Sequence, residues 1–311
     1  MNGSQLFDEI NKEVSKVIFG KEEELKLILS CWLSGGHILL EDVPGNGKTV
    51  LSKTLAKIFK VDFSRVQFTP DLLPSDILGT TIYDEEARKF YFRKGPLFTT
   101  LFLADEINRA TPRTQSALLE AMAERQITIE KMSSELDELF FVMATQNPVE
   151  QYGTFPLPEA QLDRFFMQIS LGYPKRDDEL MILKSREKTN PMTEVKSIIE
   201  PSQFKNLKEE VKNVDIPDSV YNYALDIVGE TREHKKLKMG ASPRGPLALC
   251  HCARAYAFLE GRDTVLPKDI YNLSIPVLGH RIIIDPQAHY SGETTEHILR
   301  DILTKVKSPI K

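Results

Sequence analysis

Cysteines are scarce in this sequence, and it contains no long apolar run. Only three of its 311 residues are cysteine (Cys31, Cys250 and Cys252), a low, odd number that gives no disulfide framework and favours a reducing compartment. No apolar run approaches the roughly 20 residues that a membrane-spanning helix needs. The polar, charged segment 1–17 lacks the apolar core of a signal peptide. We therefore expect a soluble, cytoplasmic protein without a membrane span.

An excess of positive charge is also missing. Lys and Arg together number 40 and Asp and Glu 45, which gives a formal net charge of −5. This balance argues against a general nucleic-acid binder, although a local basic groove stays possible. The residues that are present, 41% hydrophobic and 27% charged, form a globular composition that excludes disorder and collagen-like repeats. The length suits two domains or one large one.

Strand and helix signals alternate between residues 38 and 170, which predicts an α/β fold with a mostly parallel sheet covered by helices on both faces. We expect strands at 37–40, 64–68, 99–104, 126–130, 139–145 and 166–170. We expect helices at 6–34 (two, broken at Phe19-Gly20), 47–59 and 111–124, the last with Thr111 as N-cap and Pro112 at the first position. Residues 133–138 read as a polar turn, and 72–95 read as irregular with short strand pieces.

The pattern changes after Pro174. A charged helix is expected at 177–188 and a polar linker at 190–200, and four further helices are then expected at 217–230, 243–260, 267–277 and 294–306. These helices predict a small all-α bundle. We place the domains at 1–188 for the α/β part, 189–201 for the linker and 202–311 for the helical part.

The segment Glu41–Thr49, EDVPGNGKT, follows an expected strand and opens an expected helix, as a phosphate loop does. Its glycines let backbone N–H groups turn toward a β-phosphate, Lys48 would reach the β- and γ-phosphates, and the Thr49 hydroxyl would ligate Mg²⁺. The usual pattern starts with Gly where this chain has Asp42, so we expect a strained left-handed backbone there. The alternative is a chance Gly-Lys-Thr turn. We assign the following residues to ATP: Phe19, Gly20, Pro44, Gly45, Asn46, Gly47, Lys48, Thr49 and Val50.

Two carboxylates follow the apolar strand at 99–104, at the edge where ligands bind in open α/β sheets. Asp105 would hold Mg²⁺ through water, and Glu106 would orient and polarise an attacking water. An Asp-Glu pair alone is a common start of a loop, but its position after a phosphate loop favours the functional interpretation. Asn147 follows the next strand and could hold the same water, or it could simply form an Asn-Pro turn.

Five segments resemble MoxR-type AAA+ ATPases, and the resemblance covers nearly the whole chain. They are 68–77 (FTPDLLPSDI), 103–110 (LADEINRA), 117–122 (ALLEAM), 144–148 (ATQNP) and 156–165 (PLPEAQLDRF). The resemblance implies an ATPase that converts ATP and water to ADP and phosphate with Mg²⁺. It also implies an α/β core, a helical lid and a homo-oligomeric ring, commonly a hexamer. The segment 72–95 resembles the family's insert and 126–141 its hairpin before the sensor strand, both of which face a ring pore or a client in related ATPases.

The resemblance also assigns roles to two arginines, and a third is a candidate. Arg164 matches the arginine finger, which reaches the γ-phosphate of a neighbouring subunit, with a weak surface pair to Asp163 as the alternative. Arg244 follows Ser242-Pro243 in the first turn of a lid helix and matches the second sensor, which would read the nucleotide in cis. Arg109 is a candidate for a subunit boundary.

The function implied by the resemblance is a chaperone-like remodelling of protein partners, in complex assembly or metal-cofactor insertion, often with a von Willebrand A-domain protein. Two alternatives stay open: a slow nucleotide-gated assembly switch, and a nucleic-acid remodeller, although we expect no nucleic-acid partner. The motif Cys250-His251-Cys252 suggests a metal site, but adjacent helical residues point about 100° apart and do not converge on one ion. The charged run 234–238 reads as a solvated loop, and Tyr91 reads as a core residue.

Overall fold

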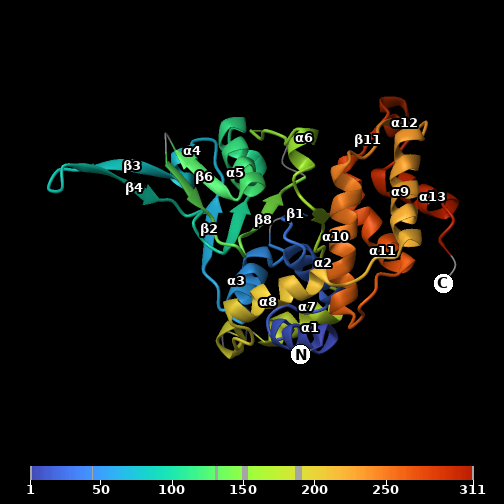
Figure 1. The fold of residues 1–311 in the computed structure, drawn as a ribbon, viewed down its shortest axis with the longest axis horizontal. Coiled ribbons are helices and arrows are strands. Elements are labelled where there is room, and N and C mark those ends of the chain that lie inside the picture. Colours follow the sequence, from blue (N-terminus) through green and yellow to red (C-terminus); the bar gives the residue numbers. More distant parts are fainter. Residues whose placement is uncertain (1, 44, 130–131, 149–152, 186–190, 310–311) are drawn as a thin grey trace.

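The computed structural model describes residues 2–43, 45–129, 132–148, 153–185 and 191–309. Its centre is a five-stranded sheet in the order β2-β5-β8-β1-β9, in which every pairing is parallel (Figure 1). The strands are β1 (Ile38–Glu41), β2 (Phe63–Gln67), β5 (Leu101–Asp105), β8 (Phe141–Gln146) and β9 (Met167–Ile169). The predicted parallel α/β sheet is confirmed.

Alternate side chains of the central strands face two different helical layers. Leu101 and Leu103 belong to one apolar cluster, together with α1, α2, α3 and the C-terminal helices, whereas Phe102 and Ala104 belong to a second cluster with α5. The helices of these layers are α1 (Gly3–Val14), α2 (Glu22–Leu33), α3 (Lys48–Ile58) and α5 (Pro112–Glu124). Because both faces are covered, the central strands β1, β5 and β8 are mostly apolar, and polar residues follow at their carboxyl ends.

The four predicted C-terminal helices are present as α9 (Asp218–Glu233), α10 (Arg244–Leu259), α11 (Pro267–Leu278) and α13 (Thr295–Lys305). The sequence reading missed four small elements, namely α12 (Pro286–Tyr290), η3 (Gly279–Arg281) and the ribbon of β10 (Leu237–Met239) and β11 (Ile283–Ile284). The charged helix is α7 (Arg176–Ser185); the part of that prediction at 186–188 lies outside the described residues. None of the helices in the described ranges is long and apolar enough to cross a membrane.

The segment before these helices packs more closely than a polar linker would. Val195 and Ile199 are buried behind η2 (Pro191–Glu194), and the N–H groups of Ile198 and Ile199 donate to the carbonyl of Ile58. The next helix, α8 (Pro201–Lys212), was not predicted, and its Phe204 packs on Trp32 with ring centroids 4.7 Å apart. A domain boundary at 189–201 stays a prediction.

The helix turn and the short strand pieces expected at 80–83 and 89–92 are present, but they are regular rather than irregular. They form α4 (Pro74–Leu78) and an antiparallel hairpin of β3 (Gly79–Asp84) and β4 (Lys89–Lys94), which projects from the body (Figure 1). The expected turn at 133–138 was wrong, because β7 (Met132–Glu135) pairs with β6 (Gln126–Ile129) while β8 joins the central sheet. A two-stranded ribbon in solvent can carry polar residues on its exposed positions, so β7 lacks an apolar signal.

Candidate functional site

The phosphate loop borders a cavity of about 360 Å³ at the carboxyl ends of β1, β5 and β8. Gly45 and Gly47 have positive φ values of +96° and +79°, a conformation that glycine adopts without strain. Helix α3 begins at Lys48, so its first N–H groups point toward the loop. The lining comprises Asp42, Gly45, Asn46, Gly47, Lys48, Thr49, Val50, Arg65, Gln67, Asp105, Glu106, Thr145, Gln146 and Asn147. This combination of loop, helix start and carboxylates suits a polyphosphate with a divalent cation.

Of the other residues assigned to ATP, Phe19 and Gly20 are not among those that line this cavity, and Pro44 lies outside the described residues. Ile18 approaches the loop next to Gly47, so the segment of Phe19 and Gly20 runs beside the cavity. Asp178 packs against Gly20 and leaves no room for a side chain there. A contact of these two residues with nucleotide stays a prediction.

Lys48 is 9% exposed, and its ammonium donates to the carbonyls of Asp42 (3.2 Å) and Val43 (2.9 Å). Burial lowers the pKa of Lys48, while the nearby carboxylates of Asp42, Asp105 and Glu106 act to raise it. A cation held in place beside three carboxylates is available for a phosphate that enters the cavity.

The expectation of a left-handed backbone at Asp42 was wrong. In the described ranges the non-glycine residues with positive φ are Lys60, Arg88, Glu106 and Arg125. The Asp42 side chain is instead 5% exposed, and it accepts hydrogen bonds from Ser170 Oγ (2.7 Å), Leu171 N (2.6 Å), Gly172 N (3.0 Å) and Asn46 Nδ2 (3.3 Å). Asp42 therefore ties the phosphate loop to the turn that follows β9.

A strained Asp42 would have meant that Asp42→Gly relaxes the loop and keeps or improves binding of ATP, and these bonds reverse that expectation. We expect Asp42→Asn and Asp42→Gly to weaken ATP binding by about tenfold or more, because each loses charge-assisted hydrogen bonds worth roughly 1.5–3 kcal/mol. Isothermal calorimetry measures the effect, with exposed Asp8→Asn on α1 as control. Equal or tighter binding in both Asp42 variants would contradict the tether.

Asp105 ends β5 and is engaged on both of its oxygens. Thr145 Oγ1 donates to Oδ1 (2.7 Å), and the Arg65 guanidinium donates to Oδ2 (2.7 Å from Nη2). Thr145 Oγ1 also accepts from the N–H of Glu106 (2.8 Å), so one hydroxyl on β8 orients both acidic residues. Arg65 was missed by sequence reasoning. The pattern that could have indicated Arg65 is the alternation of Arg65 and Gln67 with apolar Val66 on β2, the strand that pairs with β5 and its terminal Asp105.

Glu106 adopts a left-handed conformation, with φ +57° and ψ +52°. For a non-glycine residue this costs on the order of 1 kcal/mol, and such strain often occurs at active sites. Its Oε2 accepts from Gln67 Nε2 (2.7 Å) and from Arg109 Nη1 (2.9 Å). Arg109, which we considered for a subunit boundary, therefore has the Glu106 of its own chain as a partner. Asn147 is buried at the same cavity, beside Thr145.

Arg164 and Arg244 lie together in a second cavity of about 360 Å³, away from the phosphate loop. His37 and Gly35, which precede β1, line this cavity, whereas the phosphate loop follows β1. The two cavities therefore occupy opposite ends of a parallel strand. Arg164 donates to the carbonyl of Leu119 (2.9 Å), and Arg244 is in the first turn of α10, as predicted.

Comparison with known proteins places this geometry in a family. Residues 37–167 match the ATPase family associated with various cellular activities (AAA), and residues 229–302 match the AAA lid domain. The chain is 39% identical over 306 residues to Chaperone MoxR1 of Mycobacterium tuberculosis, which covers 96% of this chain and 81% of that one. The chain belongs to the MoxR family of AAA+ ATPases.

Two other similarities span nearly the whole chain. The MoxR-family chain is 47% identical over 300 residues to the uncharacterised protein YeaC of Bacillus subtilis, which covers 96% of this chain and 94% of that one. A crystal structure of a protein from Cytophaga hutchinsonii, assigned as an ATPase, superposes with a TM-score of 0.91 at 41% identity, over 99% of this chain and 97% of that one. The predicted AAA+ fold with a helical lid is thus confirmed.

One assignment needs correction within this MoxR-family chain. Arg244 was expected to read the nucleotide in cis, but it does not line the phosphate-loop cavity of its own chain. The reason is the position of the lid, whose helix α10 packs on α2 and presents Arg244 and Leu247 beside Arg164 at the amino-terminal end of the strands. In this arrangement Arg244 faces the second cavity and not the phosphate-loop cavity of its own chain.

The Cys250-His251-Cys252 motif spreads its side chains over different surroundings. Cys252 is buried with its Sγ 3.6 Å from Ser34 Oγ, whereas His251 lines the cavity of Arg164. In the described part of the chain no group of three His, Cys, Asp or Glu residues is arranged to hold a metal ion. Burial raises the pKa of Cys252 to about 12, so this thiol stays protonated. Of the three residues, only Cys252 is packed in the interior.

Proposed function

We propose that this MoxR-family protein hydrolyses ATP to ADP and phosphate in a homo-oligomeric ring, commonly six subunits in this family, and uses the cycle to remodel protein partners. The observation that carries the proposal is the division of catalytic groups between two cavities of one chain. The phosphate loop and Glu106 border one cavity, and Arg164 and Arg244 line the other. Two copies placed side by side would complete one site at their boundary.

The residues at the phosphate loop fit Mg²⁺ and ATP by their chemistry. Oxygen donors from Thr49 and Asp105 border the cavity together with Lys48, and magnesium prefers such oxygen ligands. When bound, Mg²⁺ supplies neutralisation of phosphate charge. Lys48 and the loop N–H groups bind the phosphates, Glu106 accepts a proton from the attacking water, and Asn147 holds that water in place.

We assign the contact with protein partners to the β3–β4 hairpin. Its aromatic side chains Tyr83, Phe90 and Tyr91 are 48%, 71% and 48% exposed, so Tyr91 is not the core residue that its strand suggested. Exposed aromatic residues on a projecting element suit protein contact. Complex assembly, metal-cofactor insertion and a von Willebrand A-domain partner remain proposals from the family resemblance.

A slow nucleotide-gated switch is the second candidate, and the bonding of Glu106 supports it. Gln67 and Arg109 both donate to Oε2 of Glu106, and Arg65 pairs with Asp105, so these side chains compete with an attacking water and a metal ion for the two carboxylates. Steady-state ATPase rates with and without protein partners separate the candidates. Turnover that a partner raises supports the remodelling enzyme, whereas turnover that stays slow throughout supports the switch. A nucleic-acid remodeller is the less favoured third candidate, and retention on heparin at physiological salt would revive it.

Lys48→Ala should abolish detectable nucleotide binding while the fold stays intact. Among the residues of the loop described here Lys48 is the cation, and its charge has no substitute beside the phosphates. Calorimetry with ATP and a thermal melt measure both effects, and Lys53→Ala on the exposed side of α3 is the matched control. Unchanged affinity in Lys48→Ala would refute the assignment of the phosphate loop.

A further inference from the structure

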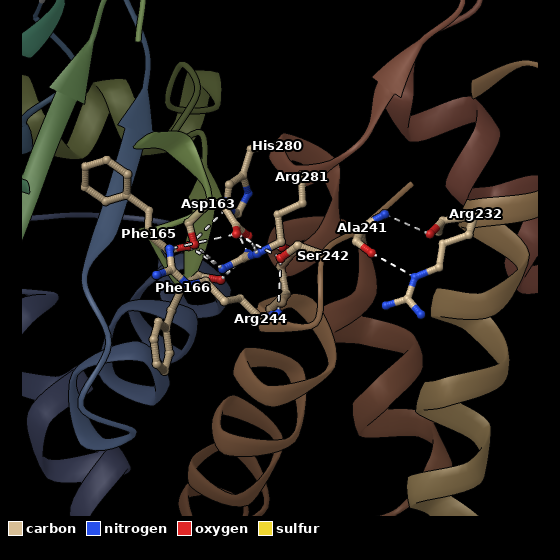
Figure 2. Close-up of polar contacts among 11 residues, drawn as sticks. Asp163, Phe165, Phe166, Arg232, Ala241, Ser242, Arg244, His280 and Arg281 are labelled. Atoms are coloured by element: carbon tan, nitrogen blue, oxygen red, sulfur yellow. Dashed lines mark hydrogen bonds and ion pairs between the residues drawn. The ribbon is translucent and has the colours of Figure 1, made fainter. Parts of the chain in front are cut away.

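One carboxylate, that of Asp163, lines the second cavity together with Arg164 and Arg244. Asp163, which precedes Arg164 in the chain, accepts from Arg281 Nε on Oδ1 (2.9 Å) and from Ser242 Oγ on Oδ2 (2.8 Å). Ser242 Oγ in turn accepts from the N–H of Arg244 (3.1 Å) (Figure 2). The network therefore connects the α/β part, through Asp163, to the lid, through Ser242 and Arg281.

Arg281 is the buried centre of this network. Its side chain is 1% exposed, and besides Asp163 its guanidinium donates to the carbonyls of Phe165 (2.6 Å) and Phe166 (3.1 Å). These bonds attach the lid to the backbone that leads from Arg164 into β9. Burial lowers the pKa of Arg281 and Asp163 acts to raise it, so the two groups stabilise each other as a buried ion pair.

The other side of the network is also fixed. Arg232 Nε donates to the carbonyl of Ala241 (3.0 Å), and the Ala241 N–H donates to Thr231 Oγ1 (3.0 Å) (Figure 2). These bonds from α9 anchor the residue before Ser242. The start of α10, and with it Arg244, is thereby held at one place relative to Asp163.

The distances show that Asp163 forms its strong ion pair with Arg281 rather than with Arg244. Arg244 Nη1 is 4.0 Å from Asp163 Oδ2 and its side chain is 57% exposed, so solvent screens this pair. The Arg281 pair is 2.9 Å long and buried, which makes it much the stronger of the two. With its carboxylate occupied by Arg281, Asp163 leaves Arg164 and Arg244 available to an outside anion.

We infer that Ser242 and Arg281 are positioning residues that hold the Asp163 carboxylate on the lid, so that Arg164 and Arg244 stay together and both reach the triphosphate of a neighbouring subunit. This inference rests on the proposed function. It means that the position of the lid determines where the Arg164 side chain of the same chain is held.

Ser242→Ala is the mildest test, because it removes one hydroxyl from the network. We expect kcat of the assembled protein to fall about tenfold with unchanged affinity for ATP, while the melting temperature falls slightly because a hydrogen bond to a charged group is lost from the folded chain. Ser291→Ala, at an exposed lid serine, is the control. The inference would be overturned if Ser242→Ala kept the wild-type kcat under the same assay conditions in which Arg164→Ala is inactive.

Arg281→Met and the double variant Arg281→Met/Asp163→Asn test the charge argument. The single variant frees a carboxylate beside Arg164 and Arg244 and should lower kcat by about a hundredfold or more, whereas the double variant should recover part of this loss. A double variant that is no better than the single one would refute the shielding role. If Arg281→Met does not fold, Arg281→Gln with and without Asp163→Asn gives the same comparison, because glutamine removes the charge and keeps donors for the backbone carbonyls.

Mixed assemblies show whether Arg281→Met impairs the phosphate loop of its own subunit or the arginine finger that it gives to a neighbour. Arg281→Met mixed with Lys48→Ala should regain activity, because one protein supplies phosphate loops and the other supplies fingers. Arg281→Met mixed with Arg164→Ala should not, because neither supplies a competent finger. Recovery in both mixtures, or in neither, would overturn the inference. An active Arg164→Ala would overturn the proposed function first, which keeps the two failures distinct.

Discussion

Arg164→Ala should lower ATP turnover by about 10³–10⁵-fold and leave ATP affinity nearly unchanged. The physical reason is that Arg164 lies at the opposite end of β1 from the phosphate loop of its own chain, so it contributes nothing to binding there. In a neighbouring site its guanidinium would neutralise charge that develops in the transition state, which is worth a factor of this size. Steady-state kinetics and calorimetry measure the two quantities, and exposed Arg300→Ala on α13 is the control.

Mixing Arg164→Ala with Lys48→Ala tests whether the finger acts in trans. The first protein supplies intact phosphate loops and the second supplies intact fingers, so some boundaries regain both. A monomeric enzyme could not complement in this way. Sizing in the presence of ATP verifies that the mixed assembly has formed. A verified mixed assembly without recovered activity would favour Arg164 as a structural residue that holds the Leu119 carbonyl.

Glu106→Gln should lower turnover by about two to four orders of magnitude while ATP binding survives, because glutamine keeps the size of the side chain but cannot accept the proton of the attacking water. Single-turnover hydrolysis measures this, with exposed Glu9→Gln on α1 as the control. Wild-type turnover in the variant would remove Glu106 from the catalytic role. The same variant is expected to trap protein clients, which affinity purification would identify.

The hydrogen bonds from Gln67 and Arg109 to Glu106 offer a physical reason for slow turnover. Both side chains donate to the Glu106 carboxylate, which competes with its role as a base. The low basal turnover of the switch hypothesis would then be a consequence of this bonding rather than of the phosphate loop.

The sequence by itself determined the sheet and the site at its carboxyl edge. Loop chemistry is local: Gly45, Gly47 and Lys48 lie within four residues, and Asp105 and Glu106 directly follow an apolar strand. Parallel strands bring their carboxyl ends to one edge, so Asn147 could be placed beside them without a structure. Helix spacing likewise predicted the four large helices of the lid.

The tertiary structure decided what depends on contacts between distant segments. Asp42 was read as strained because its partners at Ser170, Leu171 and Gly172 are 128 or more residues away in the chain. Arg244 was placed in cis because the first turn of a helix is local, whereas the packing of α10 on α2, which carries it to Arg164, is not. A sequence shows which side chains a helix or loop presents, but only the packing of the lid decides which nucleotide they face.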